Sequence, residues 1–194
     1  MRKILLFVWA CMGLVCLMSA CKTSVKSKEW KLVWVENFDQ KNSFDESVWT
    51  KIPRGTSDWN NYMSYYDSCY AMQDGNLILR GIANHTQKND TAPYLTGGVY
   101  TKGKKLFTGG RVEVCARLQA AKGAWPAIWM LPEKAEWPKG GEIDIMERLN
   151  HDHIAYQTTH SYYTHILGIK DNPPHGGINK INPEEYNIYS VDIY

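Results

Sequence analysis

The chain has few cysteines, and most of them lie near its N-terminus. Of the five cysteines in its 194 residues, only Cys69 and Cys115 follow residue 21. Two cysteines do not make a disulfide framework, so the class of small disulfide-stapled secreted domains is excluded. In an oxidising compartment these two could pair, and two buried thiols explain them equally well.

The sequence also lacks an excess of charge and a helical pattern. Its 22 Lys and Arg residues nearly balance its 20 Asp and Glu residues, so nothing indicates a nucleic-acid partner. After residue 21 no stretch keeps an apolar period of 3.6 residues, and no internal repeat or dividing linker is visible. These absences argue against a helical bundle and a repeat array, and they leave about one domain's worth of chain.

The one long apolar run lies at the start of the chain. Residues 4–17 are short for a membrane span and follow the basic Arg2 and Lys3, which is typical of a secretion signal. The run closes with Leu-Met-Ser-Ala-Cys at residues 17–21, which resembles a bacterial lipobox. An ordinary secretion signal with a coincidental Cys21 is the alternative.

We therefore expect residues 1–20 to be a lipoprotein signal peptide, Cys21 to be lipidated and residues 21–29 to form a polar tether. A lipid would anchor the protein to a membrane without spanning it. The expected location is beyond the inner membrane, on the periplasmic or cell-surface face of the outer membrane.

The remaining chain, residues 30–194, has the pattern of an all-β domain. Apolar and polar residues alternate over residues 30–38, and a turn with a short strand follows at residues 75–81. Residues 97–100 and 109–117 repeat the order of glycines followed by alternation. Short strands separated by Gly and Asn turns indicate a β-sandwich or a barrel.

Two segments refine this prediction. Within residues 109–117, the apolar Val112, Val114 and Ala116 fall on one face of the expected strand. Residues 151–182 are rich in His, Asn, Pro and Gly, so we expect loops there around one strand near residues 155–163.

Aromatic residues are abundant. The chain holds eight Trp and twelve Tyr, and flat apolar rings are what sugar rings stack on in carbohydrate sites. Core packing explains such residues equally well, so composition alone does not decide between the two.

The most informative stretch is Glu-Ile-Asp-Ile-Met-Glu at residues 142–147. Isoleucines alternating with acids favour a strand, on which Glu142 and Asp144 share one face while the isoleucines face the core. Glu147 lies an odd number of residues from Glu142 and would point the other way. A one-residue bulge near Ile145 or Met146 would return Glu147 to the face of the other acids.

Three acids on one face are electrostatically costly, because like charges at short range raise at least one pKa. A glycosidase uses this crowding, since it needs an ionised carboxylate and a protonated carboxyl beside the same bond. A solvated acidic edge strand and a calcium site are the alternatives from pattern alone.

The same stretch resembles the active-site signature of glycoside hydrolase family 16, and the likeness extends along the chain. Residues 123–132, with Trp-Pro-Ala-Ile-Trp-Met-Leu, resemble a strand of that family. Further segments resemble its other strands: residues 30–38, 74–77, 97–102, 110–113 and 189–194.

The resemblance implies a β-jelly-roll sandwich of two antiparallel sheets with a concave substrate cleft. It also implies a retaining endo-glycosidase that cleaves internal β-linkages by double displacement. By position, Glu142 is then the nucleophile, Glu147 the general acid and base, and Asp144 the residue that orients or tunes the nucleophile.

The resemblance further implies substrate-binding residues. Trp125 and Trp129 are four residues apart and so share a strand face, and His160 occupies a position where relatives have a cleft histidine. Trp59 and Asn60 begin a loop that also resembles a substrate-binding loop of the family. Core packing is the alternative for the two strand tryptophans, and an ordinary hydrogen-bonded residue is the alternative for His160.

That loop departs from the β-1,3-glucan-cleaving members, which have Asn-Asn-Glu-x-Gln-Tyr-Tyr. Tyr62 stands in place of the Glu and Ser64 in place of the Gln. Because a site's polar partners for sugar hydroxyls strongly determine specificity, we expect β-galactoside-containing host glycans slightly ahead of β-1,3-glucan.

The chain stops at Tyr194 within an expected strand, whereas relatives continue, so we expect residues 30–194 to be a C-terminally truncated catalytic domain. A non-catalytic glycan-binding lipoprotein on the same fold is the rival interpretation. The expected partner is a polysaccharide or O-glycan, with no nucleic acid, a membrane contact only through the lipid, and a monomeric state. The chemistry requires no cofactor and no metal, and a structural calcium away from the acids is compatible with it.

Overall fold

The computed structural model describes residues 30–194, of which Leu32–Tyr194 form a compact unit. The predicted signal peptide, the lipidation of Cys21 and the tether lie outside the described residues. Within residues 30–194 no helix has the length and apolar character needed to cross a membrane.

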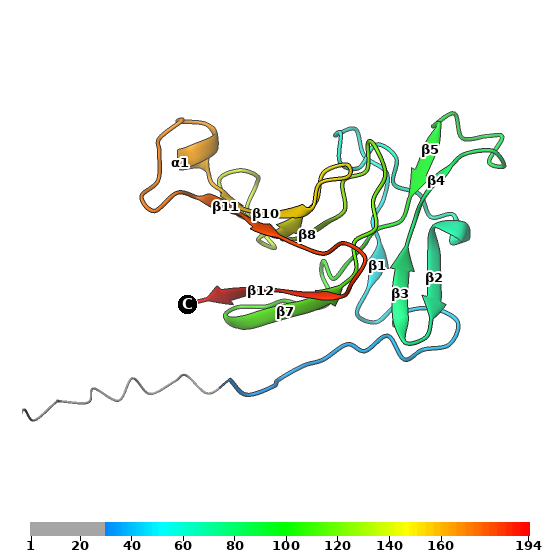
Figure 1. Ribbon diagram of the computed structural model, residues 1–194, viewed down its shortest axis with the longest axis horizontal. Helices are drawn as coiled ribbons and strands as arrows, with labels where there is room; N and C mark the ends of the chain where they lie inside the picture. The colour runs from blue at the N-terminus through cyan, green and yellow to red at the C-terminus, as the bar shows by residue number, and fades with distance from the viewer. Residues whose placement is uncertain (1–29) are drawn as a thin grey trace, which may run out of the picture. The chain divides into compact units, whose positions relative to one another are not determined.

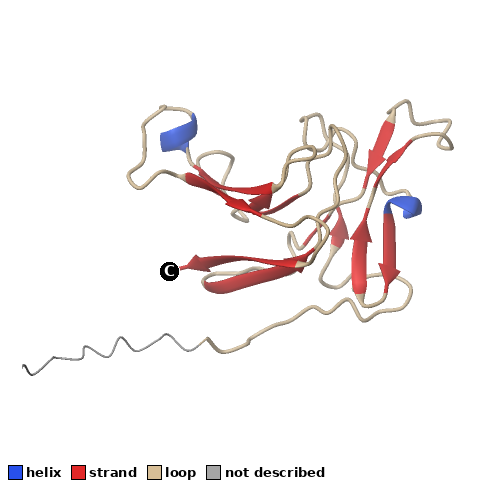
Figure 2. Ribbon diagram, viewed as in Figure 1, coloured by secondary structure: helices blue, strands red, loops and turns tan. Residues whose placement is uncertain are grey.

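The described chain is almost entirely strand and loop (Figure 2). The first strands are β1 Thr50–Lys51, β2 Tyr70–Gln73, β3 Asn76–Leu79, β4 Gly81–Ala83, β5 Tyr94–Thr96 and β6 Val99–Tyr100. The later strands are β7 Gly110–Ala116, β8 Ala127–Met130, β9 Glu142–Glu147, β10 Ile154–His160, β11 Gly176–Lys180 and β12 Asn187–Ile193. Two short helices complete the fold: the 3-10 turn η1 Asp67–Cys69 and the α-helix α1 Tyr162–His165.

All ladders between the named strands are antiparallel. The largest sheet has the order β11-β10-β9-β8, and β7 pairs with β12 beneath it (Figure 1). The pairs β1-β6, β2-β3 and β4-β5 form separate two-stranded ladders. The all-β prediction is therefore confirmed, and the β2-β3 hairpin closes at Asp74 and Gly75, whose φ angles of 52° and 69° are the left-handed values that such a tight turn needs.

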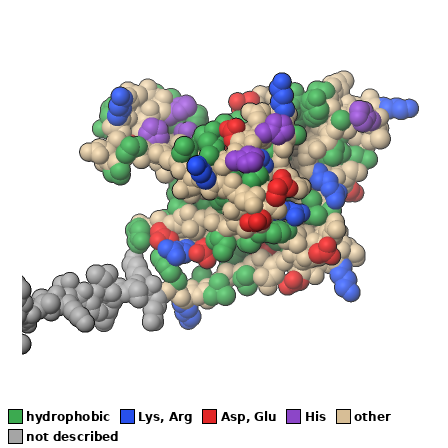
Figure 3. Space-filling model, viewed as in Figure 1, with side chains coloured by type: hydrophobic (Ala, Val, Ile, Leu, Met, Phe, Trp, Pro, Cys, Tyr) green, Lys and Arg blue, Asp and Glu red, His purple; other side chains and the backbone are tan. Residues whose placement is uncertain are grey.

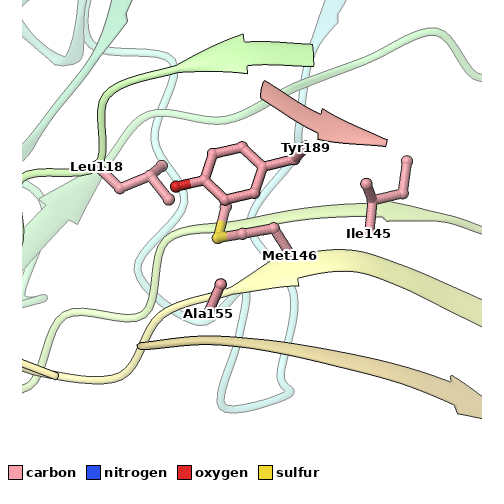
Figure 4. Close-up of a cluster of buried hydrophobic side chains, with 5 residues drawn as sticks. All are labelled: Leu118, Ile145, Met146, Ala155 and Tyr189. Carbon is pink, nitrogen blue, oxygen red and sulfur yellow. The ribbon is translucent and has the colours of Figure 1, made fainter. Parts of the chain in front are cut away.

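The main core lies between the four-stranded sheet and the β7-β12 pair. Ile145 and Met146 of β9 meet Ala155 of β10 and Tyr189 of β12, with Leu118 closing one end (Figure 4). Met146 is fully buried. As predicted, the residues of β7 alternate, with Val112, Val114 and Ala116 partly buried and their neighbours exposed. This core holds β9 firmly against the layer below and leaves the opposite face of the sheet for other contacts.

Two sequence-based expectations about strands are wrong. Residues 30–38 form no strand, and Leu32, Val33 and Val35 are 76%, 89% and 56% exposed. Alternation offers a face to bury, but a strand also needs a hydrogen-bonded neighbour, and none of the described strands pairs with this segment.

The second error concerns residues 151–182, which hold β11 and α1 as well as the predicted strand. Every residue of β11 is exposed, so its sequence carries no apolar alternation to reveal it. The two cysteines follow neither proposed arrangement fully, because Cys69 is buried, Cys115 is exposed, and both are free thiols.

Candidate active site

A β-bulge in β9 brings its acids to one face, as the sequence predicts. Opposite β8, Met146 pairs with Ile128 and Asp144 with Trp129, so Ile145 is the extra residue. The register with β10 shifts at the same place. The extra residue sends both Ile145 and Met146 into the core, which returns Glu147 to the face of Glu142 and Asp144.

Neighbouring strands hold the bulge in place. The Gln157 side chain of β10 donates to the Ile145 carbonyl at 3.0 Å, and Asn179 of β11 donates to the Gln157 side-chain oxygen at 2.7 Å. Just after the bulge, the buried Arg148 donates through its Nε to the Asp152 carbonyl at 2.6 Å and through its backbone N–H to the Pro126 carbonyl at 3.0 Å. These contacts fix the backbone on both sides of Glu147.

Asp144 is the most buried of the three acids, at 5% exposure, while Glu142 and Glu147 are partly buried. The pKa of Asp144 is raised from 3.8 to about 7, mainly by burial and in addition by the negative charges of Glu147 and Glu142. His160 Nε2 lies 3.1 Å from Asp144 Oδ2. Near neutral pH the proton on Asp144 therefore reduces the charge that the three acids carry together.

Each glutamate accepts a hydrogen bond from a tryptophan. Trp125 Nε1 donates to Glu147 Oε1 at 2.7 Å, and Trp137 Nε1 donates to Glu142 Oε2 at 2.7 Å. Both indoles are about half exposed, at 46% and 49%. The two indole donors can hold the two carboxylates in fixed orientations while leaving their other oxygens open to a ligand.

Trp137 is a site residue that the sequence analysis missed. A signal was present, since Trp137 lies in the loop that leads directly into Glu142. Gly140 and Gly141 close that loop: a Cβ on Gly140 would lie 2.5 Å from the side chains of Ala135 and Pro132, and Gly141 has a φ of 81°. The loop therefore returns tightly to β9 and brings the indole over the first acid.

The other predicted binding residues divide into two groups. Trp129 pairs with Asp144 across the sheet, and the Trp59 ring contacts the Trp129 ring at 5.5 Å, so both lie beside the acids. Asn60 instead supports its own turn, because its Oδ1 accepts the backbone N–H of Ser57 at 3.1 Å. Among the described contacts, none joins the Asn60 side chain to an acid.

The two residues that depart from glucan-cleaving relatives make local contacts. The Tyr62 ring meets the Tyr94 ring edge-on at 6.1 Å, and Ser64 Oγ accepts the backbone N–H of Tyr66 at 3.2 Å. Neither contact reaches the acids: Tyr62 contributes an aromatic ring, and the Ser64 hydroxyl supports its own turn.

In the described part of the chain, no group of three or more His, Cys, Asp or Glu side chains is arranged as the ligands of a metal ion would be. Two hollows of about 310 and 300 Å³ lie away from the acids, one beside Arg54 and Asp90 and one between β10 and β12. The acid face carries the indoles of Trp125 and Trp137, which bind the two glutamates.

Comparison with known proteins agrees with this arrangement. A family profile described as the XgeA-like catalytic GH16 domain matches residues 66–180, which is more than half of the chain. The keratan-sulfate endo-1,4-beta-galactosidase of Sphingobacterium multivorum is 38% identical over 174 residues, covering 87% of this chain and 40% of that protein. A beta-glucanase of Rhodothermus marinus is 31% identical over 189 residues, covering 91% of this chain and 64% of that protein. The chain thus spans less than two thirds of either relative.

Solved structures of the same family share the fold. The laminarinase from Rhodothermus marinus superposes with a TM-score of 0.74 at 29% identity, over 86% of this chain and 68% of that one. The laminarinase catalytic domain from Thermotoga maritima gives a TM-score of 0.71 at 28% identity, over 86% and 71%. These similarities confirm the predicted jelly-roll fold, and with the profile match they show that the chain belongs to glycoside hydrolase family 16.

Proposed function

We propose that this domain is a retaining endo-β-glycosidase whose reaction is carried by Glu142 and Glu147. The observation that supports this most strongly is the bulge at Ile145, which places two tryptophan-bound glutamates and a buried aspartate on one accessible face. A strand with only a structural role gains nothing from this crowding.

The reaction has two displacements. Glu142 attacks the anomeric carbon while the bond to the departing sugar breaks, and the departing oxygen takes a proton from Glu147. In the second step Glu147 removes a proton from water, which attacks the same carbon and releases Glu142 from the glycosyl ester. Each glutamate is restored at the end.

Asp144 supports the first step because its protonated side chain is neutral. With a pKa of about 7 it is protonated over the acidic range, and a neutral Asp144 repels an ionised Glu142 less than a charged one would. A protonated carboxyl can also donate a hydrogen bond. We therefore assign Asp144 to tuning the nucleophile and His160, 3.1 Å away, to orienting Asp144.

For the substrate we propose β-galactoside-containing glycans ahead of β-1,3-glucan. Two observations favour this: Tyr62 and Ser64 do not supply the polar groups expected of a glucan-cleaving loop, and a similar curated protein is named a keratan-sulfate endo-1,4-beta-galactosidase. The laminarinase structures, at 28% and 29% identity against 38% for the galactosidase, favour the glucan. We further propose secretion, lipidation at Cys21 and a monomeric state.

The test incubates the protein with keratan sulfate, mucin O-glycans, laminarin and mixed-linkage glucan, and measures new reducing ends. We expect products from at least one β-linked glycan, with the largest yield from a galactoside. E142Q and E147Q should each lose most of this activity. Binding without products from any of the four would favour the rival interpretation, a glycan-binding protein. Turnover unchanged in E142Q would overturn the nucleophile assignment.

A further inference from the structure

The connection between β10 and β11 contacts the acid site through aromatic rings. The His165 imidazole of α1 meets the Trp137 indole at 4.6 Å between ring centroids, with the planes tilted by 64°. Trp137 in turn donates to Glu142. On its other side, His165 lies 6.0 Å from the His160 ring, which pairs with Asp144. The His165 side chain thus lies beside both Trp137, the partner of Glu142, and His160, the partner of Asp144.

The backbone places His165 firmly. Ser161 caps α1: its Oγ accepts the Thr164 backbone N–H at 3.1 Å, and Thr164 Oγ1 accepts the Ser161 backbone N–H at 3.3 Å. The His165 backbone N–H donates to the Ser161 carbonyl at 2.8 Å. This reciprocal cap begins one residue after His160, so His165 stands one helical turn beyond the sheet at a defined position.

A second contact joins the same two segments. Lys139, in the loop that carries Trp137, lies with its Nζ 6.0 Å from the centre of the Tyr162 ring. Figure 1 shows α1 at the end of β10, projecting beyond the sheet, and Figure 3 shows histidine side chains gathered on that projection. Two contacts between one loop and one short helix define a small interface beside the acids.

Trp137 needs this support because burial does not supply it. Its side chain is 49% exposed, so packing alone leaves its rotamer weakly determined. Edge-to-face ring contact has a preferred geometry and a modest energy of its own. Without it the indole N–H could turn to water and leave Glu142 free to rotate.

We propose that His165 is a positioning residue: its ring holds Trp137 against Glu142, so that the β10–β11 connection sets the orientation of the attacking carboxylate. The consequence for catalysis rests on the proposed role of Glu142, whereas the positioning contact does not.

The consequence follows from which oxygen is engaged. Trp137 binds Oε2 of Glu142, which leaves Oε1 to form the bond to the anomeric carbon as the bond to the departing sugar breaks and Glu147 protonates the departing oxygen. Oε2 then becomes the carbonyl oxygen of the ester and still accepts the indole N–H. The same hydrogen bond therefore serves before and after attack, and reorientation costs are avoided.

The first test measures the contact between His165 and Trp137 without an activity assay. In ¹⁵N-labelled full chain, the Trp137 indole N–H signal is identified by its loss in W137F. We expect H165A to shift this signal and to speed its exchange with solvent by about threefold to tenfold, in line with the loss of one ring contact. H165F, which keeps an aromatic edge, should stay near wild type. H175A is the matched control, since His175 belongs to the same connection but pairs with Asp171. An unchanged Trp137 signal in H165A would overturn the proposal.

The second test measures kcat and KM on a glycan that the wild-type protein cleaves. H165A should lower kcat by about threefold to tenfold with KM within about twofold, H165F should recover most of the loss, and the unfolding temperature should not change. A rise in KM alone would mean that the connection binds sugar and does not orient Glu142, against the proposal. If wild type cleaves no glycan, the proposed function fails, and the indole measurement still decides whether His165 positions Trp137.

Discussion

Replacing Asp144 with Asn should change how the stability of the fold depends on pH. Asp144 is 5% exposed, and its pKa rises from 3.8 to about 7 in the folded state. The folded protein therefore binds the Asp144 proton more tightly than the unfolded chain does. The resulting stabilisation is fully present below about pH 4 and is lost as the pH rises through 7. Asn cannot ionise, so D144N should not show this loss.

The size of the effect follows from the shift. The pKa of Asp144 rises from 3.8 to about 7, a change of about 3. Each whole pKa step corresponds to about 1.4 kcal/mol, so the change corresponds to about 4 kcal/mol of unfolding free energy. This is an upper value, because a protonated His160 at 3.1 Å would favour the ionised Asp144. D144N and wild type should thus have similar free energies of unfolding at pH 4, and the variant should be more stable by up to about 4 kcal/mol at pH 8.

The assay is urea unfolding followed by tryptophan fluorescence at pH 4, 5, 6, 7 and 8. The informative quantity is the difference in unfolding free energy between D144N and wild type at each pH. E133Q is the control, because Glu133 is exposed and its substitution should change stability by about 0.5 kcal/mol or less at every pH. A difference between D144N and wild type that is constant from pH 4 to 8 would refute the reasoning.

Three further predictions concern the surroundings of the acids. W125F keeps the ring but removes the donor to Glu147, so it should lower kcat about tenfold or more in a reducing-end assay, and unchanged kcat would show that this hydrogen bond is dispensable. M146A removes a fully buried side chain beside the bulge and should lower the free energy of unfolding by about 2–5 kcal/mol in urea; a loss below about 1 kcal/mol would argue against this core. G140A places a Cβ 2.5 Å from two side chains in the Trp137 loop, so it should shift the Trp137 indole N–H signal in NMR spectra, and an unshifted signal would mean that the loop adapts.

The sequence was most informative for β9, where the spacing of the acids can be compared with the two-residue period of a strand. Glu142 and Glu147 are five residues apart on a segment whose isoleucines require a buried strand face, so a bulge follows from the period of two. The structure places it at Ile145. Trp125 and Trp129 were expected to share the face of one regular strand. Trp129 lies in β8 opposite Asp144, whereas Trp125 lies before β8 begins and donates to Glu147 from there.

The remaining features depend on contacts that no local pattern encodes. Trp137 reaches Glu142 because a loop turns back on two glycines, and the ring contact with His165 joins segments that β9 and β10 separate in the chain. The exposed β11 has no apolar face to reveal it. For residues 30–38 the error is the reverse: their alternation predicts a strand, but no described strand pairs with them.

The central claim is that Glu142 and Glu147 carry out a double displacement. It is tested most directly by recording ¹H NMR spectra during the first minutes of hydrolysis, on the glycan that gives the largest yield of reducing ends. Two inversions at the anomeric carbon retain its configuration, so the β-anomer of the new reducing end should appear first and the α-anomer only later, by mutarotation. The α-anomer appearing first would contradict the claim.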